Sequence, residues 1–76
     1  MFNKFRENVK SLLKRERLTY AQLATMTNFA ESTIKGFMCG VNDSRRVAEK
    51  IANCLNCALQ YEAGEYLLIS KEEHND

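Results

Sequence analysis

Residues 19–40 constrain the fold of this 76-residue chain more than any other stretch, because two short helical patterns stand there on either side of one turn. Thr19 is a good N-cap residue, and Gln22 follows it at the spacing of a capping box. Asn28 tolerates the left-handed backbone conformation that ends a helix. Phe29 after it is an apolar residue in a turn, where it would fill part of a core. These signals predict one helix before Asn28 and a second directly after the turn.

The two predicted helices cover residues 20–27 and the stretch from residue 30 or 31 to Gly40. The second helix should turn its apolar side chains inward, and these are Ile34, Phe37 and Met38. The positions left for its other side are Glu31, Ser32, Lys35, Gly36 and Cys39. Ala24 on the first helix is small enough for the two helices to cross closely. We therefore assign residues 19–39 to a helix-turn-helix unit.

Apolar residues at spacings of three and four predict a helix on each side of this unit. The first covers residues 3–17. The second follows the capping residues that end at Ser44 and ends between about residues 55 and 60. Residues 62–65 have the composition of a turn, and residues 66–69 form either a short strand or a fifth helical turn.

The composition favours a compact helical domain, because the chain has no proline, three glycines and 45% hydrophobic residues. We predict an all-α fold of four to five helices over residues 1–70, with a polar, frayed tail over residues 71–76. A chain of this length buries a limited fraction of its surface, so we expect it to be marginally stable alone or stabilised by self-association.

Charge is distributed unevenly along the chain. Residues 1–50 hold ten Lys or Arg and five Asp or Glu, a balance of +5, whereas residues 51–76 hold one Lys and five acids, a balance of −4. A basic body with an acidic tail favours an anionic partner for the first part. The alternative is that the tail only keeps the protein soluble.

The sequence also bears on the compartment. No apolar run is long enough to span a membrane, and the charged start Met-Phe-Asn-Lys-Phe-Arg lacks the apolar stretch of a secretion signal. Three cysteines cannot all pair within one chain, which suits a reducing compartment. We therefore expect a cytoplasmic protein without a membrane partner.

The unit over residues 18–40 resembles the phage Cro and lambda-repressor family of DNA-binding domains, also called the XRE family. The matching motifs are Leu18-Thr19, Leu23-Ala24, the Asn28-Phe29-Ala30 turn, Ser32-Thr33-Ile34 and Gly40. Weaker likenesses continue through Lys50-Ile51-Ala52, Leu55 and the stretch over residues 62–67. The resemblance implies a lambda-repressor-like fold over most of residues 5–69 and binding to double-stranded DNA.

In this family the second helix of the unit lies in the major groove, and its first half contacts base edges. Carried over position by position, the resemblance implies base contacts by Glu31, Ser32, Lys35 and Gly36. It implies phosphate contacts by Thr19, Tyr20, Gln22, Asn42, Ser44, Arg45 and Arg46, which lie at two helix N-termini. Arg45 and Arg46 have the alternative of being ordinary exposed first-turn residues.

Three positions depart from the family pattern. The family usually has Gln where this chain has Tyr20, Ser where it has Ala30, and often Glu near Met38. The first two departures weaken the direct transfer of DNA contacts to this chain.

The apolar run Tyr66-Leu67-Leu68-Ile69 has two interpretations. It either covers the first and fourth helices of the same chain or forms a dimer contact. Family members usually dimerise to bind two half-sites, so the resemblance implies a homodimer through residues 66–69.

Other chemical motifs are weak. Cys54-x-x-Cys57 lacks the second pair that a structural zinc site needs, and we interpret both residues as small thiols on or beside the apolar side of the fourth helix. His74 has no orienting partner for catalysis. We expect neither an enzyme nor a metal site nor a cofactor.

Two functions from different classes follow. The first is a dimeric, sequence-specific DNA-binding regulator of bacterial or phage type, most simply a repressor. The second is a protein-interaction module, such as an antitoxin or antirepressor, which Glu31, Gly36 and the low net charge of +1 favour.

Overall fold

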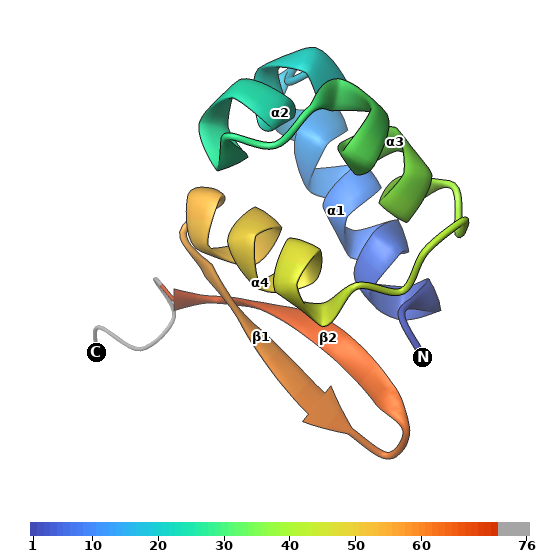
Figure 1. Ribbon diagram of the computed structural model, residues 1–76. Helices are drawn as coiled ribbons and strands as arrows, with labels where there is room; N and C mark the ends of the chain where they lie inside the picture. The colour runs from blue at the N-terminus through green and yellow to red at the C-terminus, as the bar shows by residue number, and fades with distance from the viewer. Residues whose placement is uncertain (72–76) are drawn as a thin grey trace.

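The computed structural model describes residues 1–71, and these form four helices followed by a two-stranded antiparallel sheet (Figure 1). The elements are α1 (Asn3–Glu16), α2 (Tyr20–Thr27), α3 (Glu31–Met38), α4 (Arg45–Cys54), β1 (Cys57–Glu62) and β2 (Glu65–Ser70). Of the predicted tail over residues 71–76, only Lys71 lies within the described residues.

The prediction of an all-α fold with four to five helices is wrong, because the described chain is a mixed α/β domain. Helix α4 ends at Cys54, and Asn56 takes a positive φ of 58° that turns the chain out of the helix. The apolar residues Ala58 and Leu59, which suggested a longer helix, belong to β1 instead. A run of apolar residues this short fits a helix end and a strand equally well, which is why the sequence pattern misled.

The hairpin that replaces a fifth helix closes through two residues. Glu62 pairs with Glu65, and the two residues between them, Ala63 and Gly64, have positive φ values of 53° and 83°. Positive φ at both central positions is the conformation of a type I′ turn, whose twist matches that of paired strands. The predicted turn over residues 62–65 is confirmed, and residues 66–69 are strand rather than helix.

The predicted start of α2 is confirmed in atomic detail. The Gln22 N–H donates to Thr19 Oγ1 at 3.1 Å, and the Thr19 N–H donates to Gln22 Oε1 at 2.8 Å, which is a capping box. At the other end of α2, Asn28 has a φ of 66°, as expected for the residue that stops the helix. The third helix ends at Met38, two residues before the predicted Gly40.

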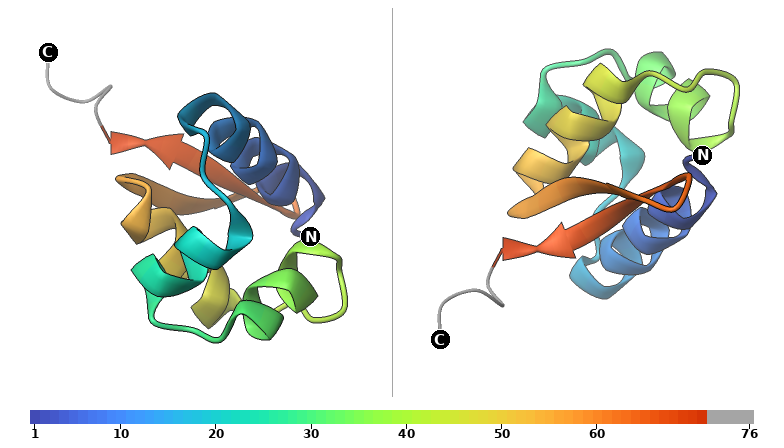
Figure 2. Two further views of the ribbon diagram at one scale, coloured as in Figure 1. Left: turned by 90° about the horizontal axis from the view of Figure 1, so that it is seen from above. Right: turned by 90° about the horizontal axis from the view of Figure 1, so that it is seen from below.

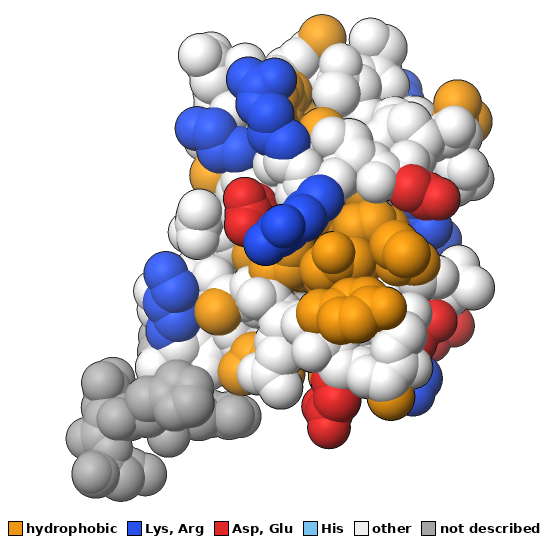
Figure 3. All heavy atoms as spheres, turned by 60° about the horizontal axis from the view of Figure 1, so that its bottom comes forward, with side chains coloured by type: hydrophobic (Ala, Val, Ile, Leu, Met, Phe, Trp, Pro, Cys, Tyr) orange, Lys and Arg blue, Asp and Glu red, His pale blue; other side chains and the backbone are white. Residues whose placement is uncertain are grey.

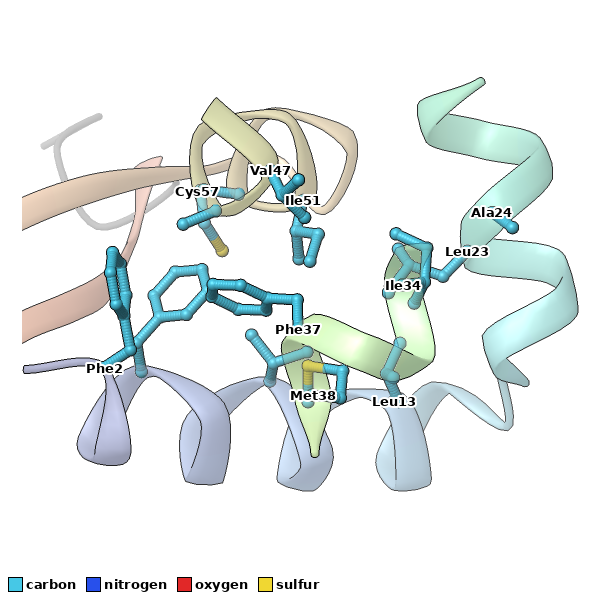
Figure 4. Packing of buried hydrophobic residues seen from close by; sticks show 14 residues of the cluster. Phe2, Leu13, Leu23, Ala24, Ile34, Phe37, Met38, Val47, Ile51 and Cys57 are labelled. Atoms are coloured by element: carbon cyan, nitrogen blue, oxygen red, sulfur yellow. The ribbon is translucent and has the colours of Figure 1, made fainter. Parts of the chain in front are cut away.

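The core is built around aromatic side chains, of which Figure 4 labels Phe2 and Phe37. Phe37 points from α3 into the space between α1 and α4, and its ring centroid lies 5.2 Å from that of Phe2 and 5.9 Å from that of Phe5. Tyr66 of β2 stacks on Phe2 with ring centroids 4.5 Å apart. Burial of one such phenylalanine contributes about 1.5–3 kcal/mol, so this cluster fixes α3 and the hairpin on α1.

The elements are arranged with α2 and α3 at one end of the molecule and the hairpin at the other (Figures 1 and 2). Helices α1 and α4 lie between them, with α1 against β2 and α4 against β1. The outer surface of α3 and the outer surface of the hairpin are therefore available to different partners.

The turn makes a first prediction. Asn adopts positive φ more readily than Ala, so Ala63→Asn should raise the free energy of unfolding by about 1 kcal/mol in urea titrations. Gly64→Ala, which puts a side chain at a φ of 83°, should instead lower the stability. An unchanged midpoint for Ala63→Asn would contradict the turn assignment.

Candidate nucleic-acid interface

The turn between α2 and α3 is tied back onto α2 by hydrogen bonds. The Phe29 N–H donates to the Ala24 carbonyl at 3.1 Å, and within the last turn of α2 Thr27 Oγ1 donates to the Leu23 carbonyl at 2.9 Å. Thr27 is 1% exposed, so its hydroxyl satisfies backbone groups inside the core. Three residues, 28–30, thus carry the chain from α2 to α3 and set the direction in which α3 leaves.

Helix α3 is divided into the inner and outer sides that the sequence predicts. Ile34 and Phe37 are fully buried and Met38 is 2% exposed. On the outer side, the predicted base-contact residues Glu31, Ser32 and Lys35 are exposed, and Gly36 is half-buried. The structure therefore brings these four residues together on one outward-facing surface.

That outer surface carries little net charge. Lys35 Nζ lies 3.1 Å from Glu31 Oε2, one helical turn earlier. Both side chains are about half exposed, at 58% and 45%, so water screens the pair and its contribution to stability is small. The arrangement places one hydrogen-bond donor, from the last turn of α3, beside one acceptor from its first turn.

The presence of a glycine at position 36 has a structural explanation that the sequence did not reveal. A methyl group at position 36 would lie 3.3 Å from Asn42 Nδ2, so the side chain of Asn42 rests against α3 where a larger residue would crowd it. Asn42 is itself held, because its Oδ1 accepts from the Ser44 N–H at 3.2 Å. Gly36 thus accommodates the loop between α3 and α4.

The segment that enters α4 contains both capping and exposed residues. Ser44 Oγ accepts from the Val47 N–H at 3.2 Å, so Ser44 is the N-cap of α4 and Asn42 braces the loop before it. Arg45 and Arg46 are exposed. Arg45 pairs with Glu49 at 3.6 Å, whereas Arg46 lies over the ring of Phe29, 5.7 Å from its centroid. Arg46 is therefore beside the turn that precedes α3.

Two lysines of α1, Lys10 and Lys14, add positive charge that the sequence-based prediction missed. They line a shallow groove of about 330 Å³ together with Thr19 and Tyr20 at the start of α2. Neither lysine forms an ion pair with any described residue. Their positions off the apolar side of α1 were visible in the sequence, but only the fold brings them beside α2.

The remaining motifs do not assemble into a reactive site. Cys54 Sγ donates to the Met26 carbonyl at 3.1 Å, and Cys57 is buried at the start of β1 rather than on α4 as predicted. Among residues 1–71 no three His, Cys, Asp or Glu side chains gather as metal ligands. His74 lies outside the described residues.

No helix within the described range has the length and apolar character needed to cross a membrane.

The residues predicted to form a dimer contact lie in β2 and divide between two faces. Tyr66 and Leu68 pack against the core, whereas Leu67 and Ile69 lie on the opposite face. Ile69 is paired there with Ala58 of β1. Figure 3 shows hydrophobic side chains gathered on the side of the molecule where the hairpin comes forward.

Comparisons of the chain with family models, with curated proteins and with solved structures give no match. The geometry of α3 and its surroundings and the resemblance of residues 18–40 are therefore the grounds for a function.

The contact between Gly36 and Asn42 makes a second prediction. Alanine is favoured over glycine in a helix by about 1 kcal/mol, so Gly36→Ala should raise the free energy of unfolding by that amount in an Asn42→Ala background. In the wild type the gain should be clearly smaller, because the new methyl group crowds Asn42. Urea unfolding of the four proteins gives this coupling. Ser32→Ala serves as control and should change the free energy of unfolding by the same amount in both backgrounds. If Gly36→Ala also raised the free energy of unfolding equally in both backgrounds, the prediction would be contradicted.

Proposed function

We propose that this protein is a sequence-specific regulator that binds double-stranded DNA through α3 and acts as a dimeric repressor of bacterial or phage type. The observation that carries the proposal is the position of α3. Its inner side is wholly buried, its outer side presents Glu31, Ser32 and Lys35, and the exposed Arg46 stands beside the turn that leads into it. A rigid helix with a polar outer side and flanking cations fits a major groove between two phosphate backbones.

The resemblance of residues 18–40 to the Cro and lambda-repressor family supports the same function. In that family the helix at the position of α3 reads bases, and the helix before it contacts phosphate. In this chain the helix before α3 is α2, and it starts with the capping box of Thr19 and Gln22. Comparison of the whole chain with known proteins adds nothing to this likeness.

Base recognition is assigned to the Glu31–Lys35 pair and to Ser32. Lys35 can donate to the O6 and N7 of guanine, and Glu31 can accept from the amino group of cytosine. Lys35 Nζ and Glu31 Oε2 are 3.1 Å apart. DNA must therefore separate the two side chains or bind both of them at adjacent base pairs. Gly36 lets the α3 backbone approach the DNA while it accommodates Asn42.

Phosphate contacts are assigned to the starts of α2 and α4 and to the lysines beside α2. Thr19 and Gln22 shape the start of α2 by capping it, and Tyr20 lies next to Lys10 and Lys14. The first-turn N–H groups of a helix and nearby ammonium groups both favour phosphate. At α4, Arg45 and Arg46 supply the charge, while Asn42 and Ser44 hold the backbone that presents them.

Dimerisation is assigned to the outer face of the hairpin. Leu67 and Ile69 lie on the face of β2 turned away from the core, where Ala58 of β1 lies opposite Ile69 and Gln60 lies opposite Leu67. This face is at the opposite end of the molecule from α2 (Figure 1). A symmetric pair through this face leaves both α3 helices free for two half-sites.

The alternative is a protein-interaction module such as an antitoxin or antirepressor. The ion pair of Glu31 with Lys35 favours it, because it makes the outer side of α3 nearly neutral. Salt dependence separates the two functions, since DNA binding weakens steeply with salt through the release of counterions. In either case we propose a cytoplasmic site of action, which suits a chain whose three cysteines cannot all pair with one another.

Two experiments test the function. The first selects bound fragments from random duplex DNA, and the second measures binding to the selected duplex at several salt concentrations. We expect an enriched sequence and a steep linear fall of log affinity with log salt. Absence of duplex binding at low salt would remove the DNA-binding proposal and favour the protein-interaction module.

Variants of Lys10 and Lys14 test the proposed phosphate contacts. Replacing Lys10 and Lys14 with Ala together should weaken binding to all duplexes alike and reduce the salt slope by about 0.9 for each lost phosphate contact. Lys4→Ala removes a charge from the first turn of the same helix, away from α2, and should leave the slope nearly unchanged. A loss confined to the selected sequence would contradict a phosphate role for the two lysines.

The dimer contact is tested by sedimentation equilibrium. We expect the wild type to form a dimer, and the double variant Leu67→Lys, Ile69→Lys to sediment as a folded monomer, because charge repulsion opposes the apolar contact. Met26→Lys, at an exposed apolar position on α2 and off the outer face of the hairpin, is the control and should remain dimeric. A wild type that is monomeric at the concentrations where it binds DNA would rule out this interface.

A further inference from the structure

Arg6 is the one Lys or Arg side chain that is buried among the described residues, with 9% of its surface exposed. Its Nε donates to the Phe37 carbonyl at 2.6 Å, and its Nη2 donates to the Asn42 carbonyl at 2.8 Å and to Asp43 Oδ1 at 2.7 Å. The guanidinium also lies over the ring of Phe37, 4.7 Å from its centroid. Arg6 is therefore held inside the fold, where it cannot contact DNA.

The loop that receives these hydrogen bonds has no apolar anchor of its own. No side chain from residue 39 to residue 46 is buried, and Val41 is 82% exposed. The Val41 N–H donates to the Gly36 carbonyl at 2.8 Å, which fixes the first half of the loop to α3. For the second half, the link to the rest of the core is the guanidinium of Arg6, which reaches Asn42 and Asp43.

Asp43 is an unexpected residue at this place. It is the single acid between residues 39 and 48, its side chain is 66% exposed, and it stands two residues before Arg45. By charge alone, a carboxylate beside proposed phosphate contacts should repel the DNA. Its bond to Arg6 gives it another role, because the carboxylate anchors the segment that leads into α4.

We propose that Asp43 is a positioning residue that promotes DNA binding through Arg6, although its own charge opposes that binding. This inference rests on the proposed function. The Arg6–Asp43 bond holds the start of α4 at a set place relative to α3, so that Arg45 and Arg46 meet phosphate while α3 lies in the groove. A loop without the bond keeps the same two arginines but presents them over a wider range of positions, which lowers the affinity.

The sign of the effect of Asp43→Ala, which removes the acceptor of the Arg6 hydrogen bond, tests the proposal. The substitution makes the protein more positive, so simple electrostatics predicts tighter DNA binding. Positioning predicts weaker binding, by about eightfold at about 0.1 M salt for one lost phosphate contact, with a salt slope smaller by about 0.9. Glu49→Ala is the matched control, because it removes the same charge from α4 and releases Arg45 without touching Arg6. It should bind at least as tightly as the wild type.

The titrations use the duplex selected with the wild type, and circular dichroism establishes that each variant is folded. Arg6→Lys is a second variant, because it keeps the charge but lacks the fork that reaches three acceptors at once. It should also weaken binding. A folded Asp43→Ala or Arg6→Lys protein that binds as tightly as the wild type or more tightly overturns the inference. A wild type that binds no duplex overturns the proposed function instead.

Discussion

The junction between α1 and α3 holds the structure together. Phe37 packs its ring among Phe2 and Phe5, and its carbonyl accepts a hydrogen bond from Arg6. One residue of α3 thus makes both the central apolar contact and the central polar contact with α1. Because Phe2 also stacks on Tyr66, the same cluster fixes the hairpin. The helix proposed to read DNA and the strand pair proposed to dimerise are both positioned from this one place.

The pairing of charged side chains explains which parts of the surface carry a net charge. Lys35 and Arg45 each lie near an acid one turn away on the same helix, and Arg6 is paired inside with Asp43. Lys10 and Lys14 form no ion pair within the described residues and stand beside the start of α2. A count of charges along the sequence treats all these residues alike. The fold separates those that neutralise one another from those still available to an anionic partner.

Two positions that looked unusual for a DNA reader have different explanations. Gly36 accommodates the close approach of Asn42, so its presence on α3 has a structural explanation that does not depend on the partner. Glu31 is paired with Lys35 at the surface, where such pairs contribute little to stability. A surface pair that adds little to folding is free to serve recognition, whether of bases or of another protein. Of the two residues, Glu31 is therefore the one whose presence the packing of the fold does not explain.

Local signals in the sequence determined the first half of this protein. The capping box at Thr19, the left-handed stop at Asn28 and the inward set of Ile34, Phe37 and Met38 were all readable, because each depends on residues within one or two helical turns. The C-terminal hairpin was not, since a short apolar run fits a strand or a helix until it has a partner. Three features depended wholly on tertiary structure: the burial of Arg6, the space left by Gly36, and the meeting of Lys10 and Lys14 with α2. Each joins residues from different elements, and no periodicity within one segment carries information about which other segment will pack against it.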